Sequence, residues 1–278
     1  MSRGHTFPKR AHRASAPHVY FGGQKGWIYA MNGQRLPKRI SPCPISEAIF
    51  ELRFTPKMPE EAVFGVVYSA VREHFPGQVE NLFPIQLPEA LRRQDPNLQY
   101  AAQYRLRSEN KIMSIGPRTI SFSNTAPYLG WTAWSGFIQE LLGKIRSTGV
   151  FGTIERTGLR YLNVFERRIL DGIRMKLSLN DSAIIDESTT IRTEFLKSGI
   201  VSILQVNNNV EITVGERSFR GSLIDIDCLA NLGESQDDFF MHSNEVIERS
   251  HNREKELFYS LLTSETLAMF NPEYEEKV

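Results

Sequence analysis

The sequence predicts an α+β fold: a mostly antiparallel β-sheet of about 7–8 strands, with helices packed on one face and a long C-terminal helix. Short alternating segments joined by tight turns indicate a meander, and apolar residues at helical spacing indicate two early helices and one late helix. The 278 residues are 41% hydrophobic, which is enough for a core. Helices on one face leave the other face to solvent, a partner or a ligand.

The first strand and the first helix are predicted before residue 77. Ser46–Phe54 alternates apolar and charged residues, as a half-buried strand does. Pro59 suits the first turn of a helix, and Glu60–Glu61 suit its positive end. Apolar residues then recur at helical spacing up to His74, and Pro76–Gly77 ends the helix.

The middle of the chain predicts three strands, a helix and a further strand. Leu98–Arg107, Ile112–Ile115 and Thr119–Ser123 are short strands separated by tight turns, so we expect them to pair antiparallel. Trp131–Arg146 has the apolar stripe of an amphipathic helix. Thr153–Phe165 is apolar on both faces near its centre, which predicts an interior strand.

The C-terminal part predicts more strands and a long helix, whereas residues 168–198 are ambiguous. Asn207–Asn209 is a natural hairpin turn because Asn tolerates a positive φ. The predicted helix is Ser235–Leu262, and its charged centre, Glu248–Glu256, is expected to be exposed or to leave only the helix ends on the sheet. Three strands are expected before it: Ile200–Val206, Val210–Val214 and Ser222–Leu229.

Charge divides the chain into a basic arm, residues 1–41, and a single α+β domain, residues 42–278. Residues 1–46 hold eight of the 33 Lys and Arg residues and no acid, so the rest has 25 basic against 32 acidic residues. We expect a poorly ordered arm, which is either a tether to nucleic acid or anionic lipid, or an upstream extension before a native start at Met31. The scattered charges favour the extension.

Several classes of protein lack support in the sequence. No phosphate loop, GxSxG or HExxH occurs, and the two cysteines, Cys43 and Cys228, do not form a zinc motif. His242 and His251 are expected to be solvated on the last helix. No signal peptide or transmembrane helix is predicted. We therefore predict a soluble, cytoplasmic protein with no cofactor, no bound metal and no assigned catalytic residue.

Charged side chains in the predicted strands are the candidate binding residues. Asp225 and Asp227 share one face of a strand, where they either bind Mg²⁺ or form ion pairs with arginines, and we favour ion pairs. Arg160 lies in the middle of a strand, so it needs a carboxylate, a ligand or a partner. The other candidates on the sheet are Arg105, Arg107, Tyr161 and Asn163.

Aromatic residues crowd the start of the helix at Trp131–Arg146. They either line an apolar pocket or belong to the core, and core packing is the commoner outcome. The candidate pocket residues are Tyr128, Trp131, Trp134 and Phe137.

Four segments together resemble a sporadically distributed family of uncharacterised bacterial and archaeal proteins of about this size. The resemblance covers residues 36–270 and implies a start near Met31, but it carries no catalytic residues. Patchy distribution is typical of mobile cassettes, such as phage-defence and toxin–antitoxin loci. The segments are Pro44–Phe54, Gly158–Asn163, Leu223–Asp227 and His251–Thr263.

We expect a non-enzymatic binding or sensor subunit that works with a protein partner encoded nearby in such a two-component cassette. One alternative is a metal-dependent phosphoryl-transfer enzyme or nuclease that uses Asp225 and Asp227. Another is a binder of an apolar ligand or lipid between sheet and helix. Nucleic acid on the basic arm, a lipid or membrane surface, and a homo-oligomer are also compatible with the sequence.

Overall fold

The computed structural model describes residues 36–86, 94–95 and 98–274. Most of the predicted arm, together with the suggested start at Met31, lies outside the described residues. Within them the chain is α+β with a large antiparallel sheet, as predicted. The sheet has nine strands, slightly more than the sequence indicates, because the ambiguous region of residues 168–198 supplies one edge strand and residues 80–81 supply the other.

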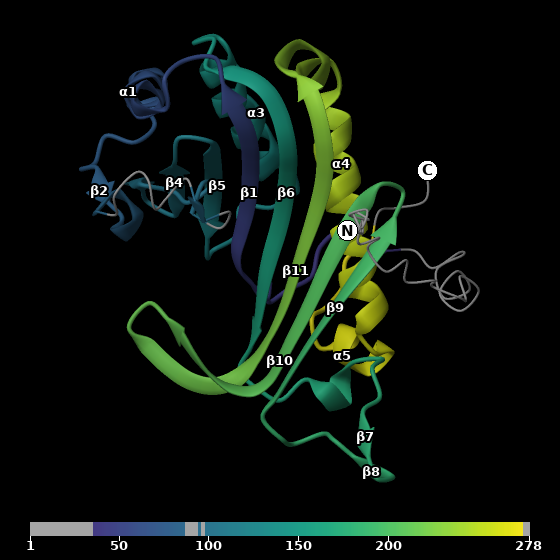
Figure 1. Cartoon of the computed structure of the whole chain (residues 1–278). Coiled ribbons are helices and arrows are strands. Elements are labelled where there is room, and N and C mark those ends of the chain that lie inside the picture. Colours follow the sequence, from purple (N-terminus) through teal and green to yellow (C-terminus); the bar gives the residue numbers. More distant parts are fainter. Residues whose placement is uncertain (1–35, 87–93, 96–97, 275–278) are drawn as a thin grey trace, which may run out of the picture. The chain divides into compact units, whose positions relative to one another are not determined.

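The sheet order is β2-β3-β4-β5-β1-β6-β11-β10-β9, and every neighbouring pair is antiparallel (Figure 1). A separate hairpin consists of β7 (Ser178–Leu179) and β8 (Ser182–Ala183). The strands of the sheet are β1 (Ile45–Pro56), β2 (Glu80–Asn81), β3 (Tyr104–Ser108), β4 (Lys111–Ile115), β5 (Thr119–Thr125), β6 (Phe151–Phe165), β9 (Thr189–Lys197), β10 (Ile200–Val214) and β11 (Arg217–Ser235).

The helices begin where the sequence provides start signals. Pro59 and two glutamates open the first helix, and the Ser235 hydroxyl accepts a hydrogen bond from the Asp238 backbone N–H at the start of the long one. The α-helices are α1 (Glu60–Val71), α3 (Trp131–Arg146), α4 (Gln236–Leu261) and α5 (Ser264–Ala268), and the short 3₁₀ helices are η2 (Phe83–Gln86) and η3 (Leu170–Gly172).

The topology is duplicated although the sequence shows no repeat. The first half runs from a long strand, β1, through a meander to α3, and the second runs from β6 through another meander to α4. In each half the last meander strand pairs with the long first strand, so β5 lies beside β1 and β11 beside β6. The two first strands pair with each other and join the halves.

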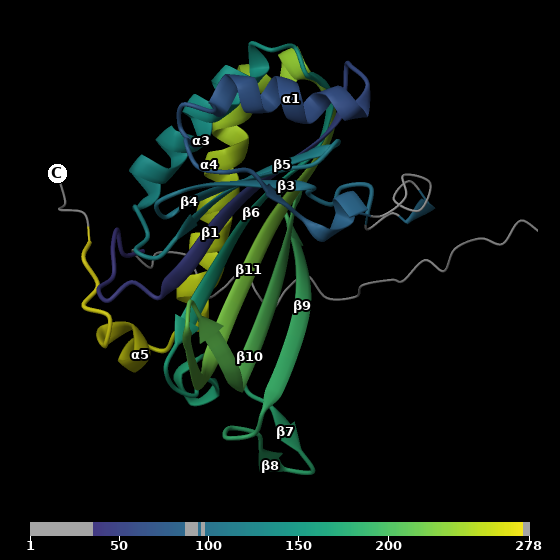
Figure 2. The same cartoon turned by 90° about the vertical axis from the view of Figure 1, so that its left-hand side faces the viewer.

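Alternation along β6 separates the two faces of the sheet. Leu159 and Tyr161 are buried beneath helices, whereas Arg160 and Leu162 between them point to the other side. The residues of β1 and β11 that are paired with Leu159 and Tyr161 are buried on the same side of the sheet. The helices α1, α3 and α4 all pack on that face (Figure 2). We call it the helix face, and we call the opposite side the open face.

The predicted strand Leu98–Arg107 is wrong in its first half. Residues 98–100 form a turn in which the backbone N–H groups of Leu98 and Gln99 donate to the Asp95 carbonyl, and the strand starts only at Tyr104. Alternation of apolar residues alone therefore does not distinguish this turn from a strand.

The predicted hairpin turn at Asn207–Asn209 is also wrong, because β10 is one continuous strand with a bulge there. Asn209 has a φ of 53°, so the residue does adopt the left-handed conformation that favoured a turn. The chain instead turns at Gly215. Opposite the bulge, a Cβ on Gly221 would lie 2.3 Å from the Phe165 carbonyl oxygen, so only glycine fits there.

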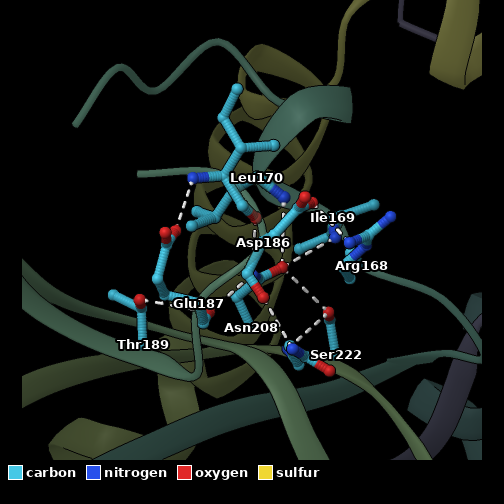
Figure 3. A network of polar contacts seen from close by, with 10 residues as sticks. Arg168, Ile169, Leu170, Asp186, Glu187, Thr189, Asn208 and Ser222 are labelled. Atoms are coloured by element: carbon cyan, nitrogen blue, oxygen red, sulfur yellow. Dashed lines mark hydrogen bonds and ion pairs between the residues drawn. The ribbon is translucent and has the colours of Figure 1, made fainter. Parts of the chain in front are cut away.

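Asn208 fastens the irregular region to the sheet (Figure 3). Its fully buried side-chain oxygen accepts hydrogen bonds from the backbone N–H groups of Ile169 (2.9 Å) and Leu170 (3.3 Å) and from the Ser222 hydroxyl (3.2 Å). Its amide nitrogen donates to the carbonyls of Ile185 (2.9 Å) and Glu187 (3.0 Å). One side chain therefore ties the segments after β6 and before β9 to β10.

The expectation that the charged centre of the last helix is exposed is wrong for its inward residues. Ser250 and Glu254 are buried, because α4 contacts the sheet along its whole length. His251, expected to be solvated, is instead stacked on Trp131 with ring centroids 3.8 Å apart. The charged residues that suggested exposure lie mostly on the outward side of the helix.

Replacing Asn208 with Ala should lower the free energy of unfolding by about 3 kcal/mol, because several buried backbone groups lose their partner together. Denaturant unfolding measures this loss. Asn207→Ala is the matched control, since Asn207 accepts only one side-chain bond, at 3.3 Å from Gln205, and should cost less than about 1 kcal/mol. Equal losses in the two variants would contradict the role given to Asn208.

Candidate functional site

The open face, opposite to α1, α3 and α4, carries two adjacent rows of side chains across the sheet (Figure 2). Its centre has small residues, with polar and charged residues around them. The first row is Leu196, Val201, Leu229, Gly158, Glu51, Ser121, Ser114 and Arg105. The second is Glu194, Ile203, Asp227, Arg160, Ile49, Ser123, Ile112 and Arg107.

Arg160 and Asp225 form the tightest ion pair of this face. The guanidinium donates from Nε to Oδ1 at 2.8 Å and from Nη2 to Oδ2 at 2.5 Å, which is a two-point contact. The Asp225 side chain is 9% exposed and that of Arg160 is 43% exposed. Both carboxylate oxygens of Asp225 thus have a hydrogen-bond donor within the protein, whereas part of the Arg160 guanidinium remains accessible to solvent.

Asp227 lies beside this pair but accepts no hydrogen bond from any described residue. Gly158, which is paired with Leu229 and lies diagonally across from Asp227, has no side chain, and a Cβ there would lie 3.5 Å from Asp227 Oδ1. Burial raises the pKa of Asp227 to about 6, although Arg160 and Arg156 favour its charged form. Asp227 is therefore a half-buried acceptor without a partner of its own.

A second charge network continues the face toward β5. Glu51 Oε1 accepts from Arg53 (2.8 Å) and Arg156 (2.7 Å). The Tyr100 ring lies 4.5 Å from the Arg53 guanidinium carbon. Sequence reasoning missed this network, although the alternation in Ser46–Phe54 had placed Glu51 and Arg53 on one face.

Tyr100 is held from its other end. Its hydroxyl donates to Glu155, which also accepts from Arg118 (2.6 Å) and from the Thr55 hydroxyl (2.7 Å). These bonds lower the pKa of Glu155 against the opposing effect of burial. The tyrosine and its two arginines therefore each have several partners, as anchor residues of protein interfaces often do.

An apolar corner completes the open face at its β9 edge. Leu196 is 76% exposed and lies beside Val201, which is in turn beside Leu229. An exposed leucine alone needs no explanation, but this one extends a short apolar row toward Asp227.

The structure separates the predicted binding residues. Arg105 and Arg107 do lie on the open face, where both pair with Glu80. Tyr161 and Asn163 are buried on the helix face instead, because they alternate with Arg160 along β6. The seven predicted strand residues do not form one site.

The predicted aromatic residues lie on the helix face in two environments. Trp134 and Phe137 belong to the hydrophobic core, with ring centroids 5.8 Å apart. Tyr128 and Trp131 flank a polar chain: the Tyr128 hydroxyl is 3.4 Å from that of Tyr161. The Tyr161 hydroxyl lies 3.1 Å from Nδ1 of the Trp131-stacked histidine, His251.

Glu254, one turn after His251, is 6% exposed and has no hydrogen bond or ion pair with a described residue. Burial raises the pKa of Glu254 to about 8 and lowers the pKa of His251 to about 3. Sequence reasoning could not detect this burial, because an acid in a charged helix segment is normally solvated.

Metal chemistry has little support in the described residues. They contain no group of three or more His, Cys, Asp or Glu side chains able to hold a metal ion. Both oxygens of Asp225 are already engaged by Arg160. The described helices also include none that is long and apolar enough to cross a membrane.

Removing Arg160 should destabilise the fold more than removing Asp225. Arg160→Ala leaves a buried carboxylate unpaired and should cost about 2 kcal/mol, discounted for the exposure of the arginine, whereas Asp225→Ala leaves a partly solvated guanidinium and should cost about 1 kcal/mol. Unfolding of the two single variants and the double variant gives the coupling. Strict additivity would show that the pair contributes nothing.

Stability should fall as pH rises because of Glu254. Its pKa in the folded protein exceeds that of an unfolded glutamate, so the folded state loses stability from about pH 4.5 until the group is ionised above about pH 8. The full loss is roughly 5 kcal/mol. Unfolding between pH 5 and pH 9 should show a much flatter dependence in Glu254→Gln. Asp227→Asn is the control, since Asp227 contributes only in the lower part of that range.

In sequence comparisons, no family model matches this chain, and no curated protein matches it either. The functional assignment therefore rests on the geometry of the two faces.

Proposed function

We propose that this protein is a non-enzymatic binding subunit whose open face docks a second protein, encoded in the same locus. The observation that carries the proposal is a wide sheet surface, opposite to α1, α3 and α4, that presents an anchored tyrosine, several arginines and an exposed leucine. Tyrosine and arginine are enriched among the residues that dominate binding energy in protein interfaces.

The charge pattern favours a protein over a nucleic acid on this face. A polyanion is bound by unpaired cations, but each arginine here has a carboxylate within 4.0 Å. The pairs are Arg53 and Arg156 with Glu51, Arg105 and Arg107 with Glu80, Arg118 with Glu155, Arg160 with Asp225, and Arg192 with Glu194.

The partner that fits this face is a protein with a basic docking surface and an apolar anchor. The chain after residue 46 carries 25 basic and 32 acidic residues, so its field attracts a basic partner. Asp227 offers a free acceptor to a cationic or hydroxyl donor, and the corner at Leu196 offers apolar contact. The resemblance to patchily distributed proteins further favours a partner in a defence or toxin–antitoxin cassette.

The metal-dependent alternative depends on Asp225 and Asp227 together. To bind a cation, Asp225 would have to release Arg160, which would leave the arginine half-buried beside the metal. Calorimetry with Mg²⁺ and Mn²⁺ separates the two functions, because only the enzyme requires binding that disappears in the Asp225→Asn/Asp227→Asn variant.

The docking proposal is tested by purifying the tagged protein from its own host and identifying stoichiometric partners by mass spectrometry. Leu196→Glu should abolish recovery of the partner, because a charge replaces the apolar anchor. Met241→Glu is the matched control: Met241 is 78% exposed but lies on α4, away from the open face. A partner lost equally in both variants, or retained in both, contradicts docking on the open face.

A further inference from the structure

The two edges of the nine-stranded sheet differ in length and regularity. One edge is β2, which has only two residues, Glu80–Asn81. The other is β9, Thr189–Lys197, whose nine residues pair with β10 without a register shift and include no proline. Natural proteins usually shorten, bulge or cover an edge strand, because its unpaired backbone groups pair readily with a strand of another chain. β9 is therefore the edge of this sheet that can accept a further strand.

The turn after β9 determines which of its residues direct their backbone outward. Ser198 and Gly199 both have a positive φ, 52° and 77°, as a two-residue type I′ hairpin turn requires. The flanking residues, Lys197 and Ile200, are then a hydrogen-bonded pair, and along an antiparallel ladder such pairs alternate with pairs that exchange no hydrogen bond. The residues whose N–H and C=O groups point away from β10 are therefore Thr190, Arg192, Glu194 and Leu196. Within the described part of the chain, these outward groups have no backbone partner.

The side chains of β9 are self-complementary about Thr193. Arg192 and Glu194 flank it on the open face, where they are 51% and 53% exposed and form an ion pair at 2.7 Å. If β9 of a second copy lies antiparallel with the two Thr193 residues opposite each other, Arg192 of each copy faces Glu194 of the other. Opposite charges directly across an antiparallel pair stabilise it. In the same arrangement Thr190 faces Leu196, so residues that direct their backbone outward meet one another.

The neighbouring registers lack this complementarity. Outward backbone groups must meet outward backbone groups, so the register changes in steps of two residues, which moves the centre of the pair by one residue. A centre at Arg192 places two arginines opposite each other, and a centre at Glu194 places two glutamates opposite each other. Like charges directly across two strands are destabilising. The charges of β9 therefore select the register centred on Thr193, whereas an edge with a single sign of charge would repel a second copy.

We propose that β9 pairs antiparallel with β9 of a second copy, centred on Thr193, so that the two sheets form one continuous sheet. A strand from a different protein would not require the charges of β9 to mirror each other, which is why a second copy is the occupant. The two-fold axis of such a pair is perpendicular to the sheet, and the interface is the same patch on both copies. The open faces of the two copies then lie on the same side of the dimer. Dimerisation does not depend on partner docking and is measured on the purified chain alone.

The test is sedimentation velocity of the full chain across a micromolar concentration series, in which the wild type should form a dimer. Arg192→Glu and Glu194→Arg each place like charges opposite each other. Each should weaken the dimer about thirtyfold, because two cross-strand pairs change from attraction to repulsion. The double variant Arg192→Glu/Glu194→Arg restores opposite charges and should dimerise like the wild type. An equimolar mixture of the two single variants should form a heterodimer for the same reason.

Arg217→Glu is the matched control, since Arg217 is an exposed arginine that is ion-paired with Glu166 at 2.8 Å but lies on β11. It should dimerise like the wild type, and circular dichroism confirms that each variant is folded. A monomeric wild type overturns the proposal, as does a dimer that persists in both single variants or is not restored in the double variant. Partner recovery from the host is scored separately, so dimerisation can fail while docking on the open face holds, and the reverse.

Discussion

The pairing of β1 with β6 is the constraint on which the rest of the structure depends. It joins the two halves, and its register fixes which residues of every other strand face the helices. Phe50 lies opposite Leu159 in the core, whereas Ile49 lies opposite Arg160 on the open face. A slip of one residue would bury Arg160 and Glu51 and expose the core, so both faces are specified together.

The two halves differ in the segment that follows their long first strand. In the first half, α1 fills the space between the long strand and the meander with apolar residues. In the second half no helix of that length occurs there among the described residues, and Asn208 instead ties an irregular segment to β10 by hydrogen bonds. The bulge that aims Asn208 inward also gives β10 its length, which is why a turn was expected at a place where the strand continues.

Alternation was sufficient to predict β1 and an apolar stripe was sufficient to predict α3, because their apolar positions each follow one period, whereas β6 was predicted from apolar residues on both faces of its centre. Alternation failed at residues 98–100, where local backbone hydrogen bonds form a turn, and the turn prediction failed at Asn208, whose buried amide resembles a solvated turn residue. For the candidate sites, position along a strand indicated that Arg160 needs a partner. The identity of that partner, Asp225, and the burial of Glu254 both depend on contacts between segments far apart in the chain. Such contacts cannot be predicted from the pattern of neighbouring residues.

The two candidate sites are separated by the thickness of one strand. Arg160 and Tyr161 are consecutive, yet the first side chain reaches Asp225 on the open face and the second reaches His251 beneath α4. Because neighbouring side chains of a strand share a backbone, a change in how α4 sits on Tyr161 would tilt Arg160 as well. The environments of the open face and of the helix face therefore meet at two consecutive residues of β6.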